Sequence, residues 1–292
     1  MLLHFLEPTK RVGWRYSLPV NQSISMHPCF SHEAHFHYGR IHLPVAPRCN
    51  ISCKFCDRKY DCVNESRPGV TSKVLDPEEA IERLERALAA EPRLRVVGVA
   101  GPGEPLYNKE TYETLRLVHD RYPELSLCVS TNGLLAEDRL SDLISCGVTT
   151  MTITINAVDF QAAYQIYTDV FVDQQQFPER TDRIRQLLYR QRSGLYRACR
   201  EGLHVKINTV LIPGINEDQV EKIARMGKYA GATVMNIMPL IPCGKMEQRS
   251  APGREAMQRA RALAGKYMPQ FLLCRQCRAD ACGIPGQNKK TV

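Results

Sequence analysis

Two repeating patterns of apolar and polar positions run through the central part of the chain. Short apolar runs rich in β-branched residues predict buried strands, and stretches in which apolar residues recur every three or four positions predict helices that bury one face. The predicted strands span residues 41–46, 94–100, 125–130, 148–156, 203–211 and 232–240. The predicted helices span residues 76–88, 108–122, 136–145, 216–229 and 254–267, and a longer charged helical stretch covers residues 160–201.

Strands that alternate with helices over short connections form parallel βαβ units. Six such strands are too few to close an eight-stranded barrel, so the sequence predicts an α/β fold with an open, partial (βα)6 barrel over residues 39–243. Residues 1–38 lack periodicity and are rich in proline and histidine, which predicts an irregular N-terminal arm. Residues 244–292 predict a helix followed by a cysteine-bearing tail.

The length, hydrophobic content, cysteine count and charge of the chain indicate which class of protein it belongs to. The chain has 292 residues, and its hydrophobic content of 43% is enough for a core without disulfides. Because the start lacks a signal-peptide pattern and no apolar run is long enough for a bilayer, we expect a cytoplasmic protein without membrane contact. The twelve cysteines are then expected to be reduced thiols available to metals. The net charge of +8 is spread over amphipathic helices, which argues against nucleic acid as a partner.

Cys49, Cys53 and Cys56 form a C-x3-C-x2-C run directly after the first predicted strand. Iron–sulfur clusters select thiolate ligands, and a four-iron cluster normally takes four of them. A run of three therefore leaves one iron open to bind something else. The alternative is a structural zinc site completed by His42, but zinc sites usually pair one C-x2-C motif with a second, distant pair of ligands.

Further soft or imidazole ligands lie on both sides of this run. His27, Cys29, His32, His35, His37 and His42 precede it, and this mixture is typical of a transition-metal site, although His32, His35 and His37 can equally be surface residues. Cys274 and Cys277 form a C-x2-C pair in the tail, with Cys282 beyond them. Cys128 lies on a predicted strand as either a buried structural thiol or a ligand, and we interpret Cys146, Cys199 and Cys243 as structural.

Ligands of parallel α/β folds bind where the carboxyl ends of the strands open. Gly101-Pro102-Gly103-Glu104 follows the second predicted strand, and its glycines allow close approach of the backbone, whose carbonyls can accept from an ammonium group. An ordinary turn is the alternative. Asn132 and Asn156 close later strands and are candidates for the same binding site.

The cysteine run, with Phe55 before its last cysteine, resembles the signature of the radical S-adenosylmethionine (SAM) superfamily. The resemblance implies a partial barrel and a [4Fe-4S] cluster whose open iron is chelated by the amino and carboxylate groups of SAM. Gly103-Glu104 is similar to the glycine-glutamate motif of the superfamily, although Gly-Pro-Gly replaces the commoner Gly-Gly. Thr154 and Ile207 match positions where the superfamily contacts the ribose and adenine of SAM.

Residues 56–72 and the sequence His27-Pro28-Cys29-Phe30-Ser31 resemble, more specifically, the NifB family of nitrogenase cofactor maturases, in the short form without a fused carrier domain. The resemblance covers nearly the whole chain. It implies an enzyme that fuses two [4Fe-4S] substrate clusters into an eight-iron carbide core. One SAM would donate a methyl group, and a second would be cleaved to a 5′-deoxyadenosyl radical that removes hydrogen from that methyl.

The resemblance also implies roles for single residues. Substrate clusters would be held by Cys29, His42, Cys62 and Cys128 on one side and by Cys274 and Cys277 on the other. Glu65 can form a surface ion pair beside Arg67, or can occupy the open iron when SAM is absent. The implied partners are SAM, iron–sulfur cluster donors and carrier or scaffold proteins. The alternatives are a radical SAM enzyme with auxiliary clusters and an organic substrate, and a non-enzymatic iron–sulfur carrier.

Overall fold

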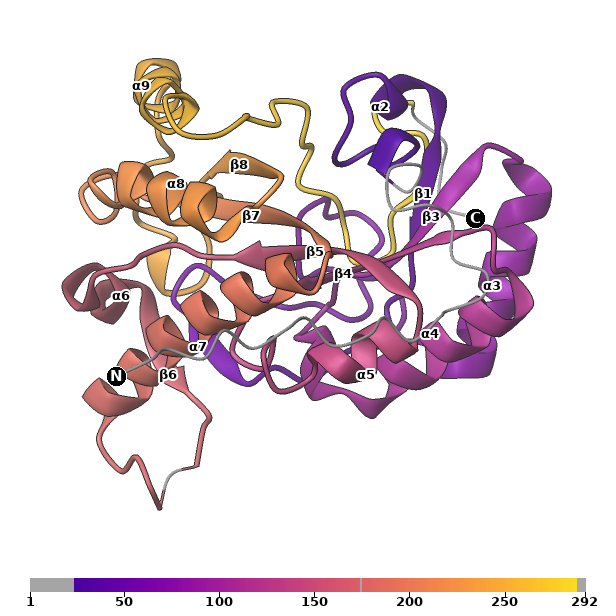
Figure 1. The fold of residues 1–292 in the computed structure, drawn as a ribbon, viewed down its shortest axis with the longest axis horizontal. Coiled ribbons are helices and arrows are strands. Elements are labelled where there is room, and N and C mark those ends of the chain that lie inside the picture. Colours follow the sequence, from indigo (N-terminus) through magenta and orange to yellow (C-terminus); the bar gives the residue numbers. More distant parts are fainter. Residues whose placement is uncertain (1–23, 174, 288–292) are drawn as a thin grey trace, which may run out of the picture.

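The computed structural model describes residues 24–173 and 175–287, which form a curled sheet covered by helices (Figure 1). The strand order in this seven-stranded sheet is β8-β7-β5-β4-β3-β1-β9. Its strands are β1 (Gly39–His42), β3 (Leu94–Val99), β4 (Ser126–Thr131), β5 (Val148–Thr154), β7 (His204–Leu211), β8 (Val234–Pro239) and β9 (Cys282–Gly283). The first six are parallel to one another, whereas β9 pairs antiparallel with β1. The prediction of a partial barrel with six parallel strands is confirmed.

Helices follow most strands and pack on the outside of the sheet. Figure 1 shows an arc of helices that runs from α3 through α4, α5 and α7 to α8. The helices are α2 (Ala34–His37), α3 (Pro77–Ala90), α4 (Lys109–Arg121), α5 (Leu140–Ser145), α6 (Phe160–Ile166), α7 (Arg180–Arg200), α8 (Gln219–Ala230) and α9 (Arg254–Gly265), with short 3-10 turns η1 (Pro105–Tyr107) and η2 (Gly244–Met246). The apolar faces of α3, α4, α5, α8 and α9 form a core with the strands, in which Leu84, Leu115 and Ile223 are fully buried. Helix α6 and the start of α7 pack in a second cluster beside the cysteine run.

Local sequence explains where several elements begin and end. The Asp76 side chain accepts a hydrogen bond from the Glu79 backbone, and Glu79 accepts one from the Asp76 backbone, which makes the capping box of α3. Strand β1 ends at His42, earlier than predicted, because Pro44 cannot donate to a sheet ladder.

The predicted helix over residues 160–201 is wrong in one respect. It is interrupted by strand β6 (Tyr167–Val170), which pairs antiparallel with β2 (Ile51–Cys53) inside the cysteine run. Tyr167 and Val170 favour strand geometry, and Pro178 prevents one continuous helix. As a result, the segment between α6 and α7 supports the backbone of the cysteine run.

The segments before β1 and after β8 pack against each other. Phe30 and Phe271 share a small buried cluster, and strand β9 of the tail adds to the edge of the sheet beside β1. Apart from a turn at its start and α2, the described part of the predicted arm is irregular. Residues 1–23, including the start that lacks a signal-peptide pattern, and residues 288–292 lie outside the described residues. Among the residues described, no helix is long and apolar enough to cross a membrane.

Candidate active site

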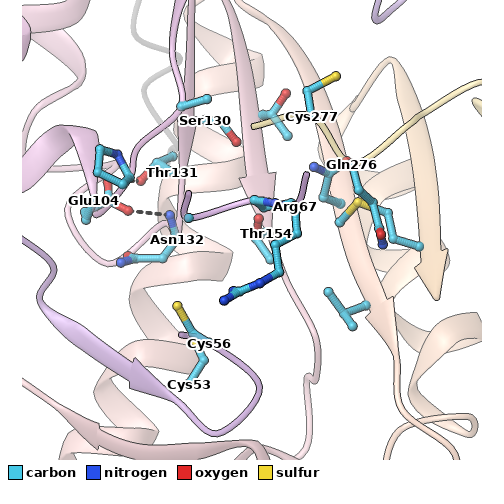
Figure 2. Close-up of a pocket in the computed structure, with 18 of the residues that line it drawn as sticks. Cys53, Cys56, Arg67, Glu104, Ser130, Thr131, Asn132, Thr154, Gln276 and Cys277 are labelled. Atoms are coloured by element: carbon cyan, nitrogen blue, oxygen red, sulfur yellow. Dashed lines mark hydrogen bonds between the residues drawn. The ribbon is translucent and has the colours of Figure 1, made fainter. Parts of the chain in front are cut away.

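A cavity of about 370 Å³ opens at the carboxyl ends of the parallel strands, where ligands of such sheets bind. Its wall contains most of the predicted site residues: Cys29, His42, Cys49, Cys53, Cys56, Gly103, Glu104, Cys128, Asn132, Thr154, Asn156, Cys274 and Cys277. In the view of Figure 2, Cys53 and Cys56 lie on one side of the cavity and Cys277 on another, with the Arg67 side chain between them. Cys62, Glu65 and Ile207 are not part of this wall.

The cysteine run is held by backbone pairing on both sides. Cys53 pairs with Tyr167 of β6, the Lys54 N–H donates to the Ile166 carbonyl at 2.9 Å, and the Cys56 N–H donates back to Cys53 at 3.1 Å. Burial raises the pKa of Cys49 to about 11 and raises the pKa values of Cys53 and Cys56 as well. These thiols are therefore protonated at neutral pH without metal, and metal binding would release their protons.

The three thiols of the run do not converge on a single metal ion in this structure. Among the residues that the structure describes, no three His, Cys, Asp or Glu side chains converge closely enough to hold one metal ion. A cubane places its thiolates on separate irons, so its ligands stand further apart than the four ligands around one zinc. The zinc interpretation of the run is thus not supported, and all twelve cysteines are free thiols.

The turn after β3 approaches the cysteine run so closely that only glycine fits. The Gly103 N–H donates to Ala46 at 2.6 Å, and a Cβ on Gly103 would lie 2.4 Å from the carbonyl oxygen of Arg48. Asn108 also links the turn to the cysteine run, because its side-chain amide group donates to the carbonyls of Arg48 and Glu104 at 2.8 and 2.7 Å. The backbone of Gly103 is therefore fixed at the cavity wall.

Glu104 is 3% exposed and accepts three hydrogen bonds from the protein. Its carboxylate accepts from the Thr131 hydroxyl at 2.6 Å, the Asn132 N–H at 2.7 Å and the Leu106 N–H at 3.1 Å, and Figure 2 marks the bond to Asn132. Burial raises the pKa of Glu104 to about 7, although these hydrogen bonds act against the rise. Glu104 thus fixes the turn after β4 that brings Asn132 to the cavity.

The candidate SAM contacts differ in how the structure places them. Thr154 lines the cavity at the end of β5, and the buried Asn156 donates to the Tyr167 hydroxyl at 3.2 Å and accepts from the Val210 N–H at 2.9 Å. Ile207 instead packs in the core towards Gly227 of α8. Its strand neighbours Lys206 and Asn208 line the cavity, because successive side chains on a strand point to opposite faces.

Strand β1 presents two side chains to the cavity. Arg40 and His42 line it, and Ile41 between them is fully buried in the core. The His42 Nδ1 atom lies 3.1 Å from the Arg278 carbonyl oxygen, and the Arg40 guanidinium donates to the Cys277 sulfur at 2.9 Å. Burial lowers the pKa of His42 to about 4, so its imidazole is neutral at pH 7.

The tail is held by a buried carboxylate. Asp280 accepts from the backbone and hydroxyl of Ser72 at 2.7 and 2.8 Å and from the Arg278 guanidinium at 2.7 and 2.9 Å. Arg278 in turn donates to the carbonyls of Glu65 and Cys62 at 2.6 and 2.8 Å. These contacts bring Cys274 and Cys277 to the wall, whereas Cys282 pairs with Ile41 in the sheet edge and is not part of the wall.

Glu65 forms ion pairs in this structure. Its carboxylate contacts the Arg67 guanidinium and the Lys59 ammonium group, the latter at 2.8 Å. Arg67 is 6% exposed, also donates to Asp57, and lines the cavity. The ion pair with Arg67 that the sequence suggests for Glu65 is present in this structure. A role of Glu65 at an open iron stays a prediction.

Several residues of the cavity wall do not stand out in the sequence. Arg40 and Lys206 are buried cations, and Lys206 could have been noticed as a charged residue inside the apolar run Val205-Lys206-Ile207. Cys243, interpreted as structural, lines the cavity, and its thiol donates to the Phe55 carbonyl at 2.8 Å. No local pattern distinguishes Cys243 from Cys146 or Cys199, because its position depends on the return of the chain after β8.

Comparisons with known proteins agree with this geometry. The family model of the radical SAM superfamily matches residues 43–227. The chain is 42% identical over 277 residues to the FeMo cofactor biosynthesis protein NifB of Klebsiella pneumoniae, covering 92% of this chain and 59% of that protein. It is 45% identical over 263 residues to the NifB protein of Methanocaldococcus infernus, covering 89% of this chain and 86% of that protein.

Among solved structures, the crystal structure of Streptococcus suis SuiB has a similar fold, with a TM-score of 0.55 and 12% identity over 78% of this chain and 48% of that chain. The chain spans less than two thirds of the length of the K. pneumoniae relative and most of the M. infernus relative. Identity above 40% extends well beyond the cysteine run in both. The chain therefore belongs to the NifB family of the radical SAM superfamily.

Proposed function

We propose that this chain is a radical SAM enzyme of nitrogenase cofactor biosynthesis that joins two [4Fe-4S] substrate clusters and inserts a carbon derived from SAM. The observation that carries the proposal is the composition of one cavity wall. Besides the three-cysteine run, the wall contains five predicted cluster ligands from the arm, β1, β4 and the tail: Cys29, His42, Cys128, Cys274 and Cys277. A radical SAM enzyme that acts on an organic substrate without auxiliary clusters has no need for so many soft ligands in its cavity.

Cys49, Cys53 and Cys56 would hold the resident cluster, which with SAM supplies a 5′-deoxyadenosyl radical. The backbone at Gly103 would accept from the SAM amino group, since the absence of a side chain lets it approach the cysteine run. Glu104 would support this site indirectly. Its carboxylate oxygens accept hydrogen bonds from Thr131 and Asn132, so they fix the turn after β4 and are not left to contact SAM. Thr154 and Asn156 would line the nucleoside end, with Asn208 in place of the Ile207 side chain.

The substrate clusters would bind across the cavity from the cysteine run. Cys128 and His42 come from strands β4 and β1, Cys29 from the arm, and Cys274 and Cys277 from the tail. His42 suits a cluster that must later move, because its neutral imidazole adds no negative charge and binds iron less strongly than a thiolate does. Cys62 lies outside the wall and stays a predicted ligand.

The proposed partners follow from this chemistry. The two NifB relatives are named for FeMo cofactor biosynthesis, and an enzyme of that kind takes clusters from donor proteins and passes its product to a carrier or scaffold protein. Twelve free thiols fit a reducing compartment, and we place the protein in the cytoplasm on that ground.

The proposal is tested with anaerobically reconstituted protein. We expect about twelve irons per chain, which corresponds to three cubanes, together with 5′-deoxyadenosine formation under a strong reductant and a product that matures apo-nitrogenase. Replacing Cys49, Cys53 and Cys56 by Ala is expected to abolish 5′-deoxyadenosine while iron remains at the other sites. Cys199→Ala, outside the cavity, is the matched control.

Two results would contradict the proposal. Normal 5′-deoxyadenosine from the triple variant would remove the radical site from the cysteine run. An iron content of about four or eight per chain, without maturation of apo-nitrogenase, would favour a radical SAM enzyme with an organic substrate or an iron–sulfur carrier.

A further inference from the structure

Two buried cations lie on the wall that carries Cys29 and Cys277. Arg40 and Lys206 are 6% and 5% exposed, and both line the cavity. In the described part of the chain, their nitrogens bond only to groups without a formal charge. Arg40 donates to the Gly283 carbonyl and to the Cys277 sulfur, and Lys206 donates to the Cys29 carbonyl at 3.3 Å. A buried cation without a carboxylate partner costs several kcal/mol, on the order of the desolvation penalty for one ion.

The same wall has hydrogen-bond donors without acceptors. Arg40 Nε and His27 Nε2 are buried and have no hydrogen-bond partner among the described residues. The His27 Nδ1 atom accepts from the Cys29 N–H at 3.1 Å, so the ring proton is on Nε2 and that atom is a donor. The Lys206 ammonium group uses one of its protons in a hydrogen bond and otherwise lies 5.2 and 5.7 Å from the rings of Phe30 and Phe271.

The two other buried charged groups of the cavity wall are compensated, and the remaining cation of the wall, Arg58, is exposed to solvent. The Glu104 carboxylate accepts three hydrogen bonds, and the Arg67 guanidinium faces the carboxylates of Glu65 and Asp57. The unmatched positive charge and the unmatched donors thus gather around Cys29 and Cys277. A ligand bound there would need to be an anion with several acceptor atoms.

We propose that Arg40, Lys206 and His27 form an anion-binding wall for a substrate [4Fe-4S] cluster. The inference rests on the proposed function and deepens it. A thiolate-ligated cubane carries net negative charge, and its sulfides accept N–H hydrogen bonds that raise its reduction potential. The wall therefore holds the cluster by charge and by hydrogen bonds to sulfur, in addition to the iron–thiolate bonds.

The test uses four variants of the full chain, among them Arg40→Lys, which keeps the charge at that position. Lys206→Met removes one charge while keeping a long side chain between the two rings, and Arg40→Gln removes the other. Lys228→Met, at an exposed position on α8, is the control for net charge. After anaerobic loading with iron and sulfide and without SAM, we measure iron content, the rate of iron loss to a chelator and cluster potentials by EPR-monitored titration.

In both wall variants, we expect one cluster to lose iron about ten- to a hundredfold faster and to have a more negative potential, since a hydrogen bond to a charged group is lost. Lys206→Met is expected to leave the metal-free protein at least as stable as the parent, because an unpaired buried cation is removed. Arg40→Lys should recover part of the potential. If Arg40→Gln does not fold, Lys206→Met and Arg40→Lys still decide the question.

Unchanged iron retention and potential in the wall variants would overturn the inference. Destabilisation of the metal-free Lys206→Met protein with normal iron retention would show a packing role instead. Weaker SAM binding with normal retention would assign the wall to the SAM carboxylate and also overturn it. Because no readout uses SAM turnover, a failure to form the cofactor precursor would contradict the proposed function alone.

Discussion

His42 and Arg278, 236 positions apart in the sequence, are joined by a hydrogen bond of 3.1 Å between the imidazole Nδ1 and the main-chain carbonyl oxygen. A carbonyl can only accept, so Nδ1 carries the ring proton and Nε2 keeps a free lone pair. This is the arrangement by which metal-binding histidines are usually oriented. The tail thus sets the tautomer that lets His42 act as a nitrogen ligand.

We expect loaded, reduced protein to show nitrogen hyperfine coupling to a paramagnetic cluster in pulsed EPR, in the absence of SAM. His42→Ala should remove this coupling and prevent formation of a precursor that matures apo-nitrogenase. His35→Ala is the control, because His35 bonds to the Pro28 carbonyl at 2.8 Å and lies outside the cavity wall. Coupling that persists in His42→Ala would show that another group supplies the nitrogen.

The tail cysteines are expected to account for one cluster. Replacing Cys274 and Cys277 together by Ala should lower the iron content by about four per chain, one cubane, without unfolding the barrel. The physical reason is that the tail follows the last βα unit and adds only β9 to the edge of the sheet. Iron analysis and circular dichroism measure the two effects, with Cys199→Ala beside them. An unchanged iron content would show that Cys274 and Cys277 bind no cluster.

Gly103→Ala tests the contact between the turn after β3 and the cysteine run. The added Cβ would meet the Arg48 carbonyl oxygen at 2.4 Å, so the backbone must move. We expect a loss of about 2 kcal/mol in unfolding free energy and strongly reduced 5′-deoxyadenosine formation. Gly253→Ala, where an added Cβ meets no atom within 4 Å, should change little in either assay. Full activity of Gly103→Ala would show that the contact is not needed.

Asp280→Asn tests how the tail is attached. Asp280 is fully buried, and its carboxylate pairs with Arg278 and accepts two hydrogen bonds from Ser72. Loss of the charge leaves Arg278 without its partner and should cost about 3 kcal/mol in urea unfolding at pH 7. Hydrogen exchange should increase first in residues 274–283. If only the global unfolding free energy changes and the tail stays protected, Asp280 stabilises the core rather than the attachment.

Glu104 predicts a pH dependence. Its pKa in the folded protein is about 7, against about 4.3 in an unfolded chain, so the folded state binds more protons between these values. Its contribution to the free energy of unfolding therefore falls as the pH rises from about 4 to about 7 and is constant above. The change is about 4 kcal/mol.

Glu104→Gln removes the titrating group, so the variant should not lose this stability. The difference in unfolding free energy, variant minus parent, should therefore increase as the pH rises from about 4 to about 7. Urea unfolding of metal-free protein at several pH values measures the slope, with Glu124→Gln at an exposed position as the control. A constant difference between variant and parent would place the pKa of Glu104 outside this range.

The elements that depend on local pattern follow from the sequence alone. Apolar periodicity specifies the six parallel strands and most helices, and Asp76 and Glu79 mark a helix start through contacts three residues apart. The three cysteines of the run, separated by short fixed spacings, indicate a cluster site for the same reason. The family resemblance also identifies Gly103 and Glu104 as site residues, and the structure brings both to the same cavity as the three cysteines.

Tertiary structure decides everything that depends on which distant segments meet. Tyr167 lies in a strand because β2 is its partner, and the sequence around it is compatible with a helix as well. Ile207 matches a family position, yet strand alternation directs its side chain into the core and leaves Lys206 on the cavity. Arg40 meets Cys277 across 237 positions, a contact that local spacing cannot encode because it arises from the packing of β1 against the tail.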